Sequence, residues 1–522
     1  MKIRRFVGIV LVLLLLAPAA LAEECVLENN TYRTGLPIVK DPITLTIATV
    51  KNASDLSDSQ NEKAAFRNIL EETGIEIEWI ELIAGTQAER VNLMLSGADM
   101  PDIFYGLLNT SLITQSTGVL LPLEDLLETW APNVVRDYAQ VDGAYEKITA
   151  PDGHIYALMG HYESLLENTC GGIQMINKAW LDAVGKPIPT TLEEYRDVLM
   201  AFKTQDPNQN GENDEIPITF AWNIGLGMGA WGFTENYRVE DGVVLPTMNT
   251  PEYREYLEFY HALMADGLID MESFSQTWAQ YASKIQMGKV GSIYGWTMLQ
   301  FLDADAAADW VVLPPFGAHK DIHPVVSGVQ DKFTGDVAVF AISRSCEYPE
   351  AALRLWDYLS RDTESKLTVA LGEKGILWDA YPDGSGYYFK VPEEATAEFT
   401  FENMKYTYGN VNFAPLILLE ETPKNDASIS PEAALRDSMV LEVYDYMLPG
   451  DESMPIRYVS PEKLEERTFI ETDLLAHINQ FQANSIMNGV TDESWNEYVS
   501  RLEDLRYSQW IAWYQDFYDG VL

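Results

Sequence analysis

Alternating apolar and polar residues mark strands in the first part of the chain. Residues 43–50 (ITLTIATV) and 75–82 (IEIEWIEL) alternate in this way, which is typical of half-buried β-strands. Residues 61–74 (NEKAAFRNILEETG) have the spacing of an amphipathic helix, and a second helix from Thr86 leads to an apolar strand at 102–106. The order strand, helix, strand, helix, strand predicts parallel pairing and therefore an α/β lobe.

A second run of α/β elements follows, with no long Gly/Ser linker before it. A helix is expected at 191–204, where Thr191 and Glu194 have the spacing of a capping box. Two α/β lobes without a linker imply that the chain crosses between them several times, which makes a hinge and an interlobe cleft. Strands are also expected at 153–160, at the start of 171–185, in 289–302 and at 335–343, and helices at the end of 171–185, at 251–266, 275–287, 348–362 and from about 425 onward.

The N-terminus reads as a secretory signal. In the first 22 residues three basic side chains precede an apolar run, and Ala20–Ala22 gives a small-residue cleavage pattern before Glu23. The apolar run is short for a transmembrane helix, although an uncleaved anchor is the alternative. Residues 23–41 are polar and irregular and are expected to be an N-terminal tether. The protein is thus expected to act outside the cytoplasm, in the periplasm or on the outer face of the membrane.

Composition limits the class of protein and of partner. The 522 residues suggest two to four domains, and an apolar fraction of 47% is enough for large cores. Loss of the signal removes three positive charges and no negative ones, so the formal charge goes from −45 to −48. Such a surface argues against nucleic acid and against anionic lipid.

The cysteines do not form a disulfide framework. Cys25, Cys170 and Cys346 allow at most one pair and leave one thiol over. Cys25 lies just beyond the expected cleavage site, so it could be lipidated, disulfide-bonded or free. Release of the mature chain is favoured over lipidation.

An ordered set of segments carries a resemblance to a known family. The most specific segment is INKAWLDAVGKPIPTTLEEYRDVLMAFKTQDPNQNGENDEIPIT (176–219). The others are ITLTIATV (43–50), LMLSGADMPDIFYG (93–106), GHIYALMG (153–160), GKVGSIYGW (288–296), VAVFAISRSCEYPEAALRLWDYLS (337–360) and GEKGILWD (372–379). With these segments the chain resembles the extracellular solute-binding proteins of ABC importers, in the family 1 carbohydrate-binding group that includes large oligosaccharide- and alginate-binding proteins.

The resemblance implies a fold and a mode of action. The fold would be α/β and two-lobed, of the periplasmic-binding-protein type, with a hinge of two or three crossings and a ligand trapped in the interlobe cleft. Lobe one would comprise residues 42–172 and 330–390, and lobe two residues 173–329 and 391–522.

An acidic loop at 204–219 (TQDPNQNGENDEIPIT) has the pattern of a calcium site. Its oxygen-bearing residues match positions 1, 3, 5, 7 and 9 of a calcium loop, and Gly211 stands at position 6, where a sharp turn is needed. Pro217 replaces the usual Glu of position 12, so Glu215 is expected to supply that carboxylate, and the resemblance also implies calcium here. The alternative is a solvated turn. The expected Ca²⁺ ligands, structural and not catalytic, are Asp206, Asn208, Asn210, Glu212 through its carbonyl, Asp214 and Glu215.

Aromatic residues at strand ends are the candidates for ligand binding. Strand ends of α/β lobes are where ligands lie, and sugars stack their C–H faces on aromatic rings while carboxylates hold their hydroxyl groups. Core packing is the alternative reading for each tryptophan. The candidate residues are Trp296, Trp222, Trp231, Trp378, Tyr162 and Glu163.

No enzyme signature accompanies these residues. The sequence has no G-x-S-x-G and no HExxH, and its glycine-rich stretch GLGMG (225–229) lacks the Lys-Ser/Thr of a phosphate loop. The resemblance, with no enzyme signature beside it, implies a non-enzymatic, monomeric binding protein that captures a sugar, in particular an oligosaccharide, and delivers it to an ABC transporter permease. The alternative is a secreted glycosidase or lyase with paired carboxylates, and a calcium-dependent adhesion protein is a third reading, which the layout disfavours.

Overall fold

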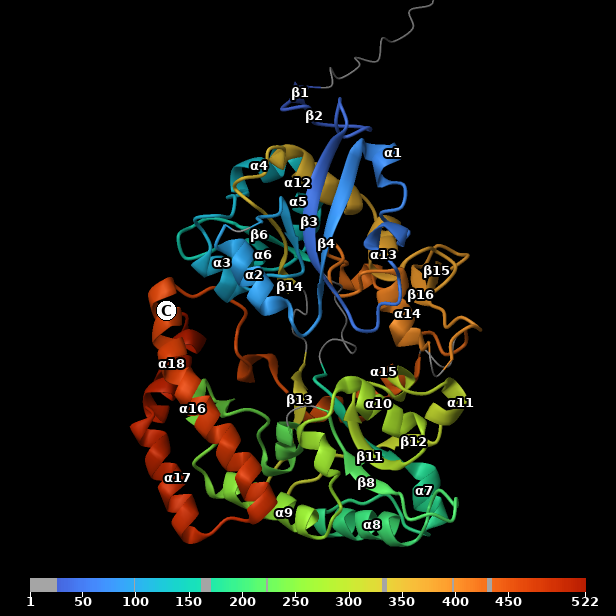
Figure 1. Ribbon diagram of the computed structural model, residues 1–522, viewed down its shortest axis with the longest axis vertical. Helices are drawn as coiled ribbons and strands as arrows, with labels where there is room; N and C mark the ends of the chain where they lie inside the picture. Colours follow the sequence, from blue (N-terminus) through green and yellow to red (C-terminus); the bar gives the residue numbers. More distant parts are fainter. Residues whose placement is uncertain are drawn as a thin grey trace, which may run out of the picture.

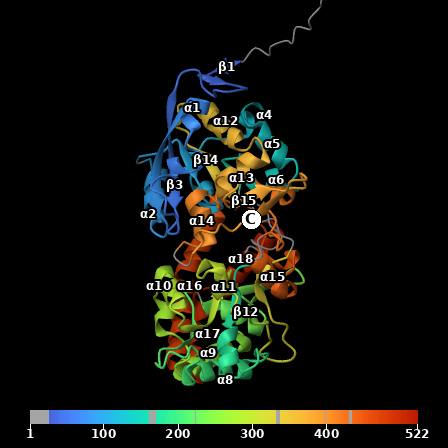
Figure 2. The same cartoon turned by 90° about the vertical axis from the view of Figure 1, so that its right-hand side faces the viewer.

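The chain folds into two α/β lobes that lie end to end along its longest axis (Figures 1 and 2). The computed structural model describes residues 26–97, 99–160, 170–221, 224–330, 336–396, 399–429 and 434–522. The expected signal peptide and Cys25 lie outside these residues. Within the described part of the chain, no helix is both long and apolar enough to cross a membrane.

Lobe one is built on a five-stranded sheet with the strand order β4-β3-β5-β14-β6. β3 is parallel to both β4 and β5, whereas β14 is antiparallel to β5 and β6. The parallel pairing predicted from the strand-helix alternation is therefore confirmed. The strands are β3 (Ile43–Lys51), β4 (Ile75–Ile83), β5 (Ile103–Tyr105), β6 (Ala157–Gly160) and β14 (Asp336–Ile342), with a separate hairpin of β15 (Trp378–Ala380) and β16 (Tyr387–Phe389).

Both faces of this sheet are covered, as parallel sheets require. Ile47 and Val339 pack into one core cluster, and Ala48 and Ala338, next to them in sequence, pack into another. The helices of this lobe are α1 (Ile69–Thr73), α2 (Gln87–Leu95), α3 (Thr110–Gln115), α4 (Glu124–Trp130), α5 (Pro132–Tyr138), α6 (Ala144–Ile148), α12 (Pro349–Leu359), α13 (Thr363–Leu371) and α14 (Phe401–Tyr408).

The helix expected at 61–74 is only partly formed. A 3₁₀ turn, η1 (Gln60–Glu62), is followed by turns and then by the short α1. The backbone becomes extended at Lys63, with φ −67° and ψ 143°. The Lys63 side chain points into the lobe, where its Nζ donates to Asp55 and to Asn410. The amphipathic spacing could not reveal that a lysine would be buried.

Residues 26–41 are not a tether. They form the hairpin β1 (Leu27–Glu28) and β2 (Thr31–Tyr32), and then Ile38 and Val39 enter the core of lobe one at 0% and 1% exposure. Arg354 on α12 donates to the Tyr32 carbonyl at 3.3 Å. The segment is therefore part of lobe one, which its mostly polar composition did not indicate.

Lobe two has a four-stranded mixed sheet with the order β12-β7-β11-β8. β11 is parallel to β8, and β7 is antiparallel to β11 and β12. The strands are β7 (Ile173–Asn177), β8 (Ile216–Thr219), β11 (Val290–Gly295) and β12 (Trp310–Val312), with a separate hairpin of β9 (Tyr237–Glu240) and β10 (Val243–Pro246). The helices are α7 (Lys178–Ala183), α8 (Leu192–Thr204), α9 (Pro251–Ala265), α10 (Trp278–Gln286), α11 (Ala304–Ala307), α15 (Ala434–Val443), α16 (Pro461–Asn488), α17 (Asp492–Asp504) and α18 (Tyr507–Asp519).

The N-terminus of α8 is capped as the sequence predicts, with one difference. The Thr191 hydroxyl accepts from the Glu194 backbone N–H at 3.2 Å. The Glu194 carboxylate accepts from the backbone N–H and hydroxyl of Thr190 instead of closing the box on Thr191. The helix therefore begins where expected and leads into the acidic loop.

The chain crosses between the lobes several times, as expected. Cys170 forms a bridge with Gly328 of β13 (Val326–Val329), and β13 runs parallel to β17 (Met447–Leu448). We call this pair of strands, with Cys170, the hinge. Cys170 and Cys346 are both buried, and they belong to core clusters of different lobes.

The lobe boundary expected at residue 390 falls later in the chain. Phe401, Met404 and Leu418 lie in the core of lobe one, so residues 401–418 belong to that lobe and not to lobe two. Lobe two resumes with α15, whose Val440 packs with β7 and β12 residues. α14 also lies against the 3₁₀ turn η4 (Met298–Gln300) of lobe two, near the junction of the lobes (Figures 1 and 2).

Candidate functional site

The acidic loop closes on its own side chains and backbone. The Asp206 carboxylate accepts from the backbone N–H groups of Asn210 and Gly211, each at 3.1 Å, and Asn210 Oδ1 accepts from Glu212 N–H at 2.7 Å. Gly211 has φ +78°, the left-handed conformation expected at position 6. Asp214 is held by Asn210 Nδ2 at 2.9 Å and by Lys289 Nζ at 2.8 Å. These contacts fold the oxygen-bearing side chains into one compact turn between α8 and β8.

Glu215 differs from the other acidic residues of this loop in the environment of its carboxylate. Both carboxylate oxygens are buried, and neither has a hydrogen-bond partner among the described residues. Burial, with the nearby carboxylates of Asp206 and Asp214, raises the pKa of Glu215 above its ordinary value. Lys289 is engaged by Asp214, whose pKa it lowers. Among the described residues, no cationic side chain is paired with this buried carboxylate.

The donor chemistry fits a hard cation. Carboxylate, amide and carbonyl oxygens are the ligands that Ca²⁺ takes in proteins, and the orphaned oxygens of Glu215 mark where positive charge is missing. Among the described residues no group of three or more His, Cys, Asp or Glu side chains is placed to hold a metal ion. A calcium ion would therefore depend on Asn208, Asn210 and backbone carbonyls as well as on the carboxylates.

Trp296 lies where the sequence places it, directly after β11. Ile173 of β7 pairs with Gly295, so Trp296 and Gly172 continue the same pair of strands toward the hinge. The indole is half-buried and its ring centroid lies 6.4 Å from that of Trp278. The ring therefore packs against Trp278 of α10, while the residue as a whole keeps part of its surface exposed at the end of β11.

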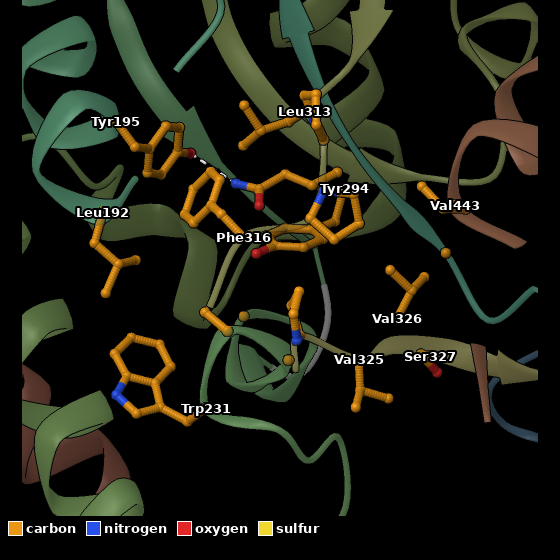
Figure 3. A pocket seen from close by; sticks show the side chains of 18 of the residues that line it. Leu192, Tyr195, Trp231, Tyr294, Leu313, Phe316, Val325, Val326, Ser327 and Val443 are labelled. Carbon is orange, nitrogen blue, oxygen red and sulfur yellow. Dashed lines mark hydrogen bonds between the residues drawn. The ribbon is translucent and has the colours of Figure 1, made fainter. Parts of the chain in front are cut away.

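Trp231 lines a pocket in lobe two but is itself buried. It is 2% exposed and packs edge-on against Tyr256, with Phe259 and Tyr260 also in contact. The pocket, which we call the tyrosine pocket, is drawn in Figure 3 with Trp231 at one end and Val326 and Ser327 of β13 at the other. An indole packed in this way can form a wall but offers no open face for stacking.

The polar groups of the tyrosine pocket come mainly from Tyr195, Gln174, Tyr260, Tyr294 and Ser327. Gln174 Nε2 donates to Tyr195 Oη at 2.8 Å, as the dashed line in Figure 3 shows. Burial raises the pKa of Tyr260 to about 12 and also raises that of Tyr195 and Tyr294. These hydroxyls therefore stay neutral, and the pocket presents neutral donors and acceptors among apolar walls.

A second, larger pocket lies on the other side of the same crossing strand. This hinge pocket shares Val325 and Ser327 with the tyrosine pocket, and its open volume is about 380 Å³ against about 70 Å³. Of these two pockets, the hinge pocket is the one that reaches the size usual for small-molecule sites, about 300–1,000 Å³. Its lining includes the charged residues Glu235, Arg238 and Glu452.

The glycine-rich turn η2 (Ile224–Trp231) joins these pockets to the hinge. Val325 N–H donates to the Gly229 carbonyl at 2.9 Å, so backbone packs directly on backbone. A Cβ on Gly229 would lie 1.9 Å from the Val325 carbonyl oxygen. Gly229 therefore serves close packing on the crossing strand and Gly227 close packing on Tyr260, in line with the exclusion of a phosphate loop.

A Gly229→Ala variant is accordingly expected to lose about 2 kcal/mol of unfolding free energy, because a methyl group is forced into a packed contact. Urea denaturation measures the loss. Gly118→Ala is the matched control, since a Cβ there meets nothing within 4 Å. Equal stabilities for the two variants would contradict this account of η2.

The remaining candidates divide into two groups. Trp378 is fully buried in the core of lobe one, and its indole N–H donates to the Gly372 carbonyl at 2.9 Å. The structure thus places Trp378 in packing and not at a ligand surface, because its polar and apolar parts are both satisfied internally. Trp222, Tyr162 and Glu163 lie outside the described residues.

The sequence did not single out the pocket tyrosines. Tyr195 and Tyr260 occupy inward positions of α8 and α9, where a helical pattern reads them as core. A weak signal was available, because tyrosine carries a hydroxyl that needs a partner when it is buried.

Comparison with known proteins decides the family. The family described as "Bacterial extracellular solute-binding protein" matches residues 64–371, which is more than half of the chain. The chain belongs to this family. The protein therefore acts outside the cytoplasm, as the N-terminal sequence also predicts. Its relatives below are binding proteins, which gives no support to the enzymatic alternative.

The similarity extends over nearly the whole chain. The fructooligosaccharide ABC transporter substrate-binding protein FusA of Streptococcus pneumoniae is 26% identical over 477 residues, covering 88% of this chain and 87% of FusA. A polygalacturonan/rhamnogalacturonan-binding protein of Bacillus subtilis, YtcQ, is 23% identical over 43% of this chain and 45% of its own.

Solved structures confirm the two-lobed fold. FusA in complex with kestose has a TM-score of 0.80 at 25% identity, covering 92% of this chain and 99% of FusA. The alginate-binding protein AlgQ2, solved without calcium ion, has a TM-score of 0.69 at 17% identity over 92% of this chain and 99% of its own. A further FusA structure is of an EF-hand mutant with fructo-nystose, with a TM-score of 0.81.

Proposed function

We propose that this protein captures an oligosaccharide between its two lobes and delivers it to the permease of an ABC importer. The observation that carries the proposal is the likeness to FusA along almost the full length of both chains. The position of the hinge pocket beside the crossing strands supports it, because a ligand held there contacts the segments that must bend when the lobes close. Contacts that favour the closed form would then stabilise closure.

The solute would lie against the hinge pocket and Trp296. The strand register brings Trp296 next to Gly172, whose neighbour Gly171 lines the hinge pocket. An accessible indole face supplies a stacking surface for a sugar ring, and Ser327 with the backbone of β13 supplies hydrogen bonds. Trp222, Tyr162 and Glu163 stay candidates on their sequence positions alone.

The decisive experiment tests binding and turnover together. The purified mature protein is incubated with a panel of oligosaccharides, fructooligosaccharides included, while thermal unfolding and product formation are followed. A ligand-dependent rise in melting temperature with unchanged sugar is the expected result. Release of shorter products would reject a pure binding function and would favour the carbohydrate-active enzyme.

Trp296→Ala is expected to weaken binding of the best oligosaccharide about 30-fold, because loss of a central aromatic contact costs about 2 kcal/mol. Isothermal titration calorimetry measures the dissociation constant. Trp296→Phe keeps an aromatic face and is expected to retain most of the affinity. If Trp296→Ala binds as tightly as the wild type, stacking on this residue is excluded.

We also infer that the acidic loop binds a structural calcium ion. The unpartnered carboxylate of Glu215 supports this, and so does the position-by-position match of the loop to calcium ligands. The ion would be held through the side chains of Asp206, Asn208, Asn210, Asp214 and Glu215, and through the carbonyl of Glu212. The ion would fix the end of α8 to the start of β8 and would take no part in chemistry. Calcium-dependent stability is the measurement that decides it.

A further inference from the structure

The walls of the two pockets are poor in positive charge. Among the described residues that line the tyrosine pocket, no side chain is charged. The described lining of the hinge pocket has three charged side chains, and the cation among them, Arg238, lies 3.3 Å from Glu240. Glu235 and Glu452 therefore set the sign of charge in the hinge pocket, which is negative.

The cation on the lobe-one helix that meets lobe two is already engaged. Lys405 is the basic residue of α14, and its side chain is 4% exposed. Its Nζ lies 3.1 Å from Glu402 and over the rings of Phe389 and Phe401. Lys405 is thus held inside lobe one and is not placed to meet a solute beside Trp296.

The surrounding protein disfavours the charged form of both carboxylates of the hinge pocket, Glu235 and Glu452. Glu235 keeps an exposed surface, yet the protein packed around its carboxylate raises its pKa. Burial raises the pKa of Glu452, and Asp451, Glu240 and Asp241 raise it further. Added negative charge in this pocket is therefore unfavourable, whether it comes from the protein or from a ligand.

We propose that the solute is an uncharged oligosaccharide and that the hinge pocket excludes sugars bearing carboxylates. This inference rests on the proposed function and narrows its substrate class. The neutral hydroxyl, amide and backbone groups of the tyrosine pocket and of β13 match sugar hydroxyls. A uronate needs a cation or several N–H donors to replace its water, and among the described residues the hinge-pocket cation Arg238 and the α14 lysine Lys405 are already paired. The formal charge of the chain, −45, adds long-range repulsion to the local effect.

The test compares trisaccharides that differ in charge. Calorimetry and thermal shift are run with kestose, maltotriose and raffinose as neutral probes, with trigalacturonate as the anionic probe and with triglucosamine as the cationic probe. We expect at least one neutral trisaccharide to bind, and trigalacturonate to bind at least about 100-fold more weakly, a difference of about 2.7 kcal/mol. Trigalacturonate or triglucosamine binding as tightly as the best neutral sugar overturns the inference but leaves the proposed function standing. If no sugar of any charge binds, the proposed function itself fails.

Charge-removing variants test whether the pocket is the cause. Glu235→Gln with Glu452→Gln is expected to raise the ratio of trigalacturonate to neutral-sugar affinity by about tenfold at low salt, and less at high salt, because exposed charges are screened. The matched control is Glu493→Gln with Glu497→Gln on the exposed face of α17, which changes net charge equally. An equal rise in the control would assign the effect to overall charge and would reject the role of the pocket.

Discussion

Removal of calcium is expected to lower the melting temperature of this protein by about 10 °C. A bound ion at about 1,000 times its dissociation constant contributes about 4.1 kcal/mol, and about 1 kcal/mol moves a domain of 150–250 residues by 2–4 °C. The ion would neutralise the carboxylate of Glu215, whose buried oxygens have no partner among the described residues. Differential scanning calorimetry with 1 mM calcium and with excess chelator measures the difference.

The Glu215→Gln substitution is expected to affect stability differently in calcium and in chelator. In calcium the variant is expected to be less stable than the wild type, because it loses a charged ligand. In chelator it is expected to be as stable or more stable, because the substitution removes a buried charge that Asp206 and Asp214 already disfavour. The variant should therefore melt at a lower temperature than the wild type in calcium, and at the same or a higher temperature in chelator.

Glu212→Gln is the matched control for the calcium site. Glu212 is exposed and is expected to bind through its carbonyl alone, so its variant should keep the full calcium-dependent shift. A calcium shift that survives in Glu215→Gln would remove Glu215 from the site. Absence of any calcium shift in the wild type would reject the metal and leave the loop as a solvated turn.

The sequence could predict features that are local in the chain. The alternation at 43–50 and 75–82 gave the parallel strands β3 and β4, since a period of two follows from strand geometry. Thr191 could be recognised as the cap of α8 because its partner lies three residues away. The acidic loop is contiguous as well, so the left-handed Gly211 could be predicted from its position in the pattern. The role of Glu215 as the carboxylate that replaces a position-12 ligand stays a prediction.

Features that depend on distant contacts could not be predicted in the same way. Whether Trp378 faces a solute or the core depends on the Gly372 carbonyl and on the packing of Tyr387 in a hairpin. The boundary at residue 390 was wrong because the apolar positions of 401–418 do not specify which lobe they fill. The hinge pocket is assembled from segments 171, 232–239, 325–329 and 448–454, so no single stretch of sequence displays it.

Lys63→Met is expected to destabilise lobe one by about 3–5 kcal/mol, because removing one partner of a buried ion pair leaves the other charge uncompensated. Lys63 Nζ donates to Asp55 at 2.9 Å, and their side chains are 3% and 2% exposed. It also donates to the carbonyls of Tyr406 and Gly409 and to Asn410 Oδ1, at 2.8–2.9 Å. Desolvation lowers the pKa of Lys63 although Asp55 lies beside it. The charged amine therefore depends on these protein acceptors, because water does not stabilise it.

This one side chain joins the start of lobe one to the segment that meets lobe two. Tyr406 belongs to α14, which lies against η4 just after Trp296. Loss of Lys63 should therefore loosen α14 as well as lower stability. Chemical denaturation measures the stability, and hydrogen exchange at the backbone of α14 measures the local effect.

The control and the rescue separate this account from a general effect of losing a lysine or arginine. Arg67→Met removes a charge from the exposed pair with Glu373, whose side chains are 47% and 57% exposed, and should change stability by less than about 0.5 kcal/mol. Asp55→Asn in the Lys63→Met background should recover part of the loss, because the orphaned carboxylate becomes neutral. A loss below about 1 kcal/mol in Lys63→Met would mean that water replaces the amine, and α14 would then not depend on Lys63 for its position at the cleft.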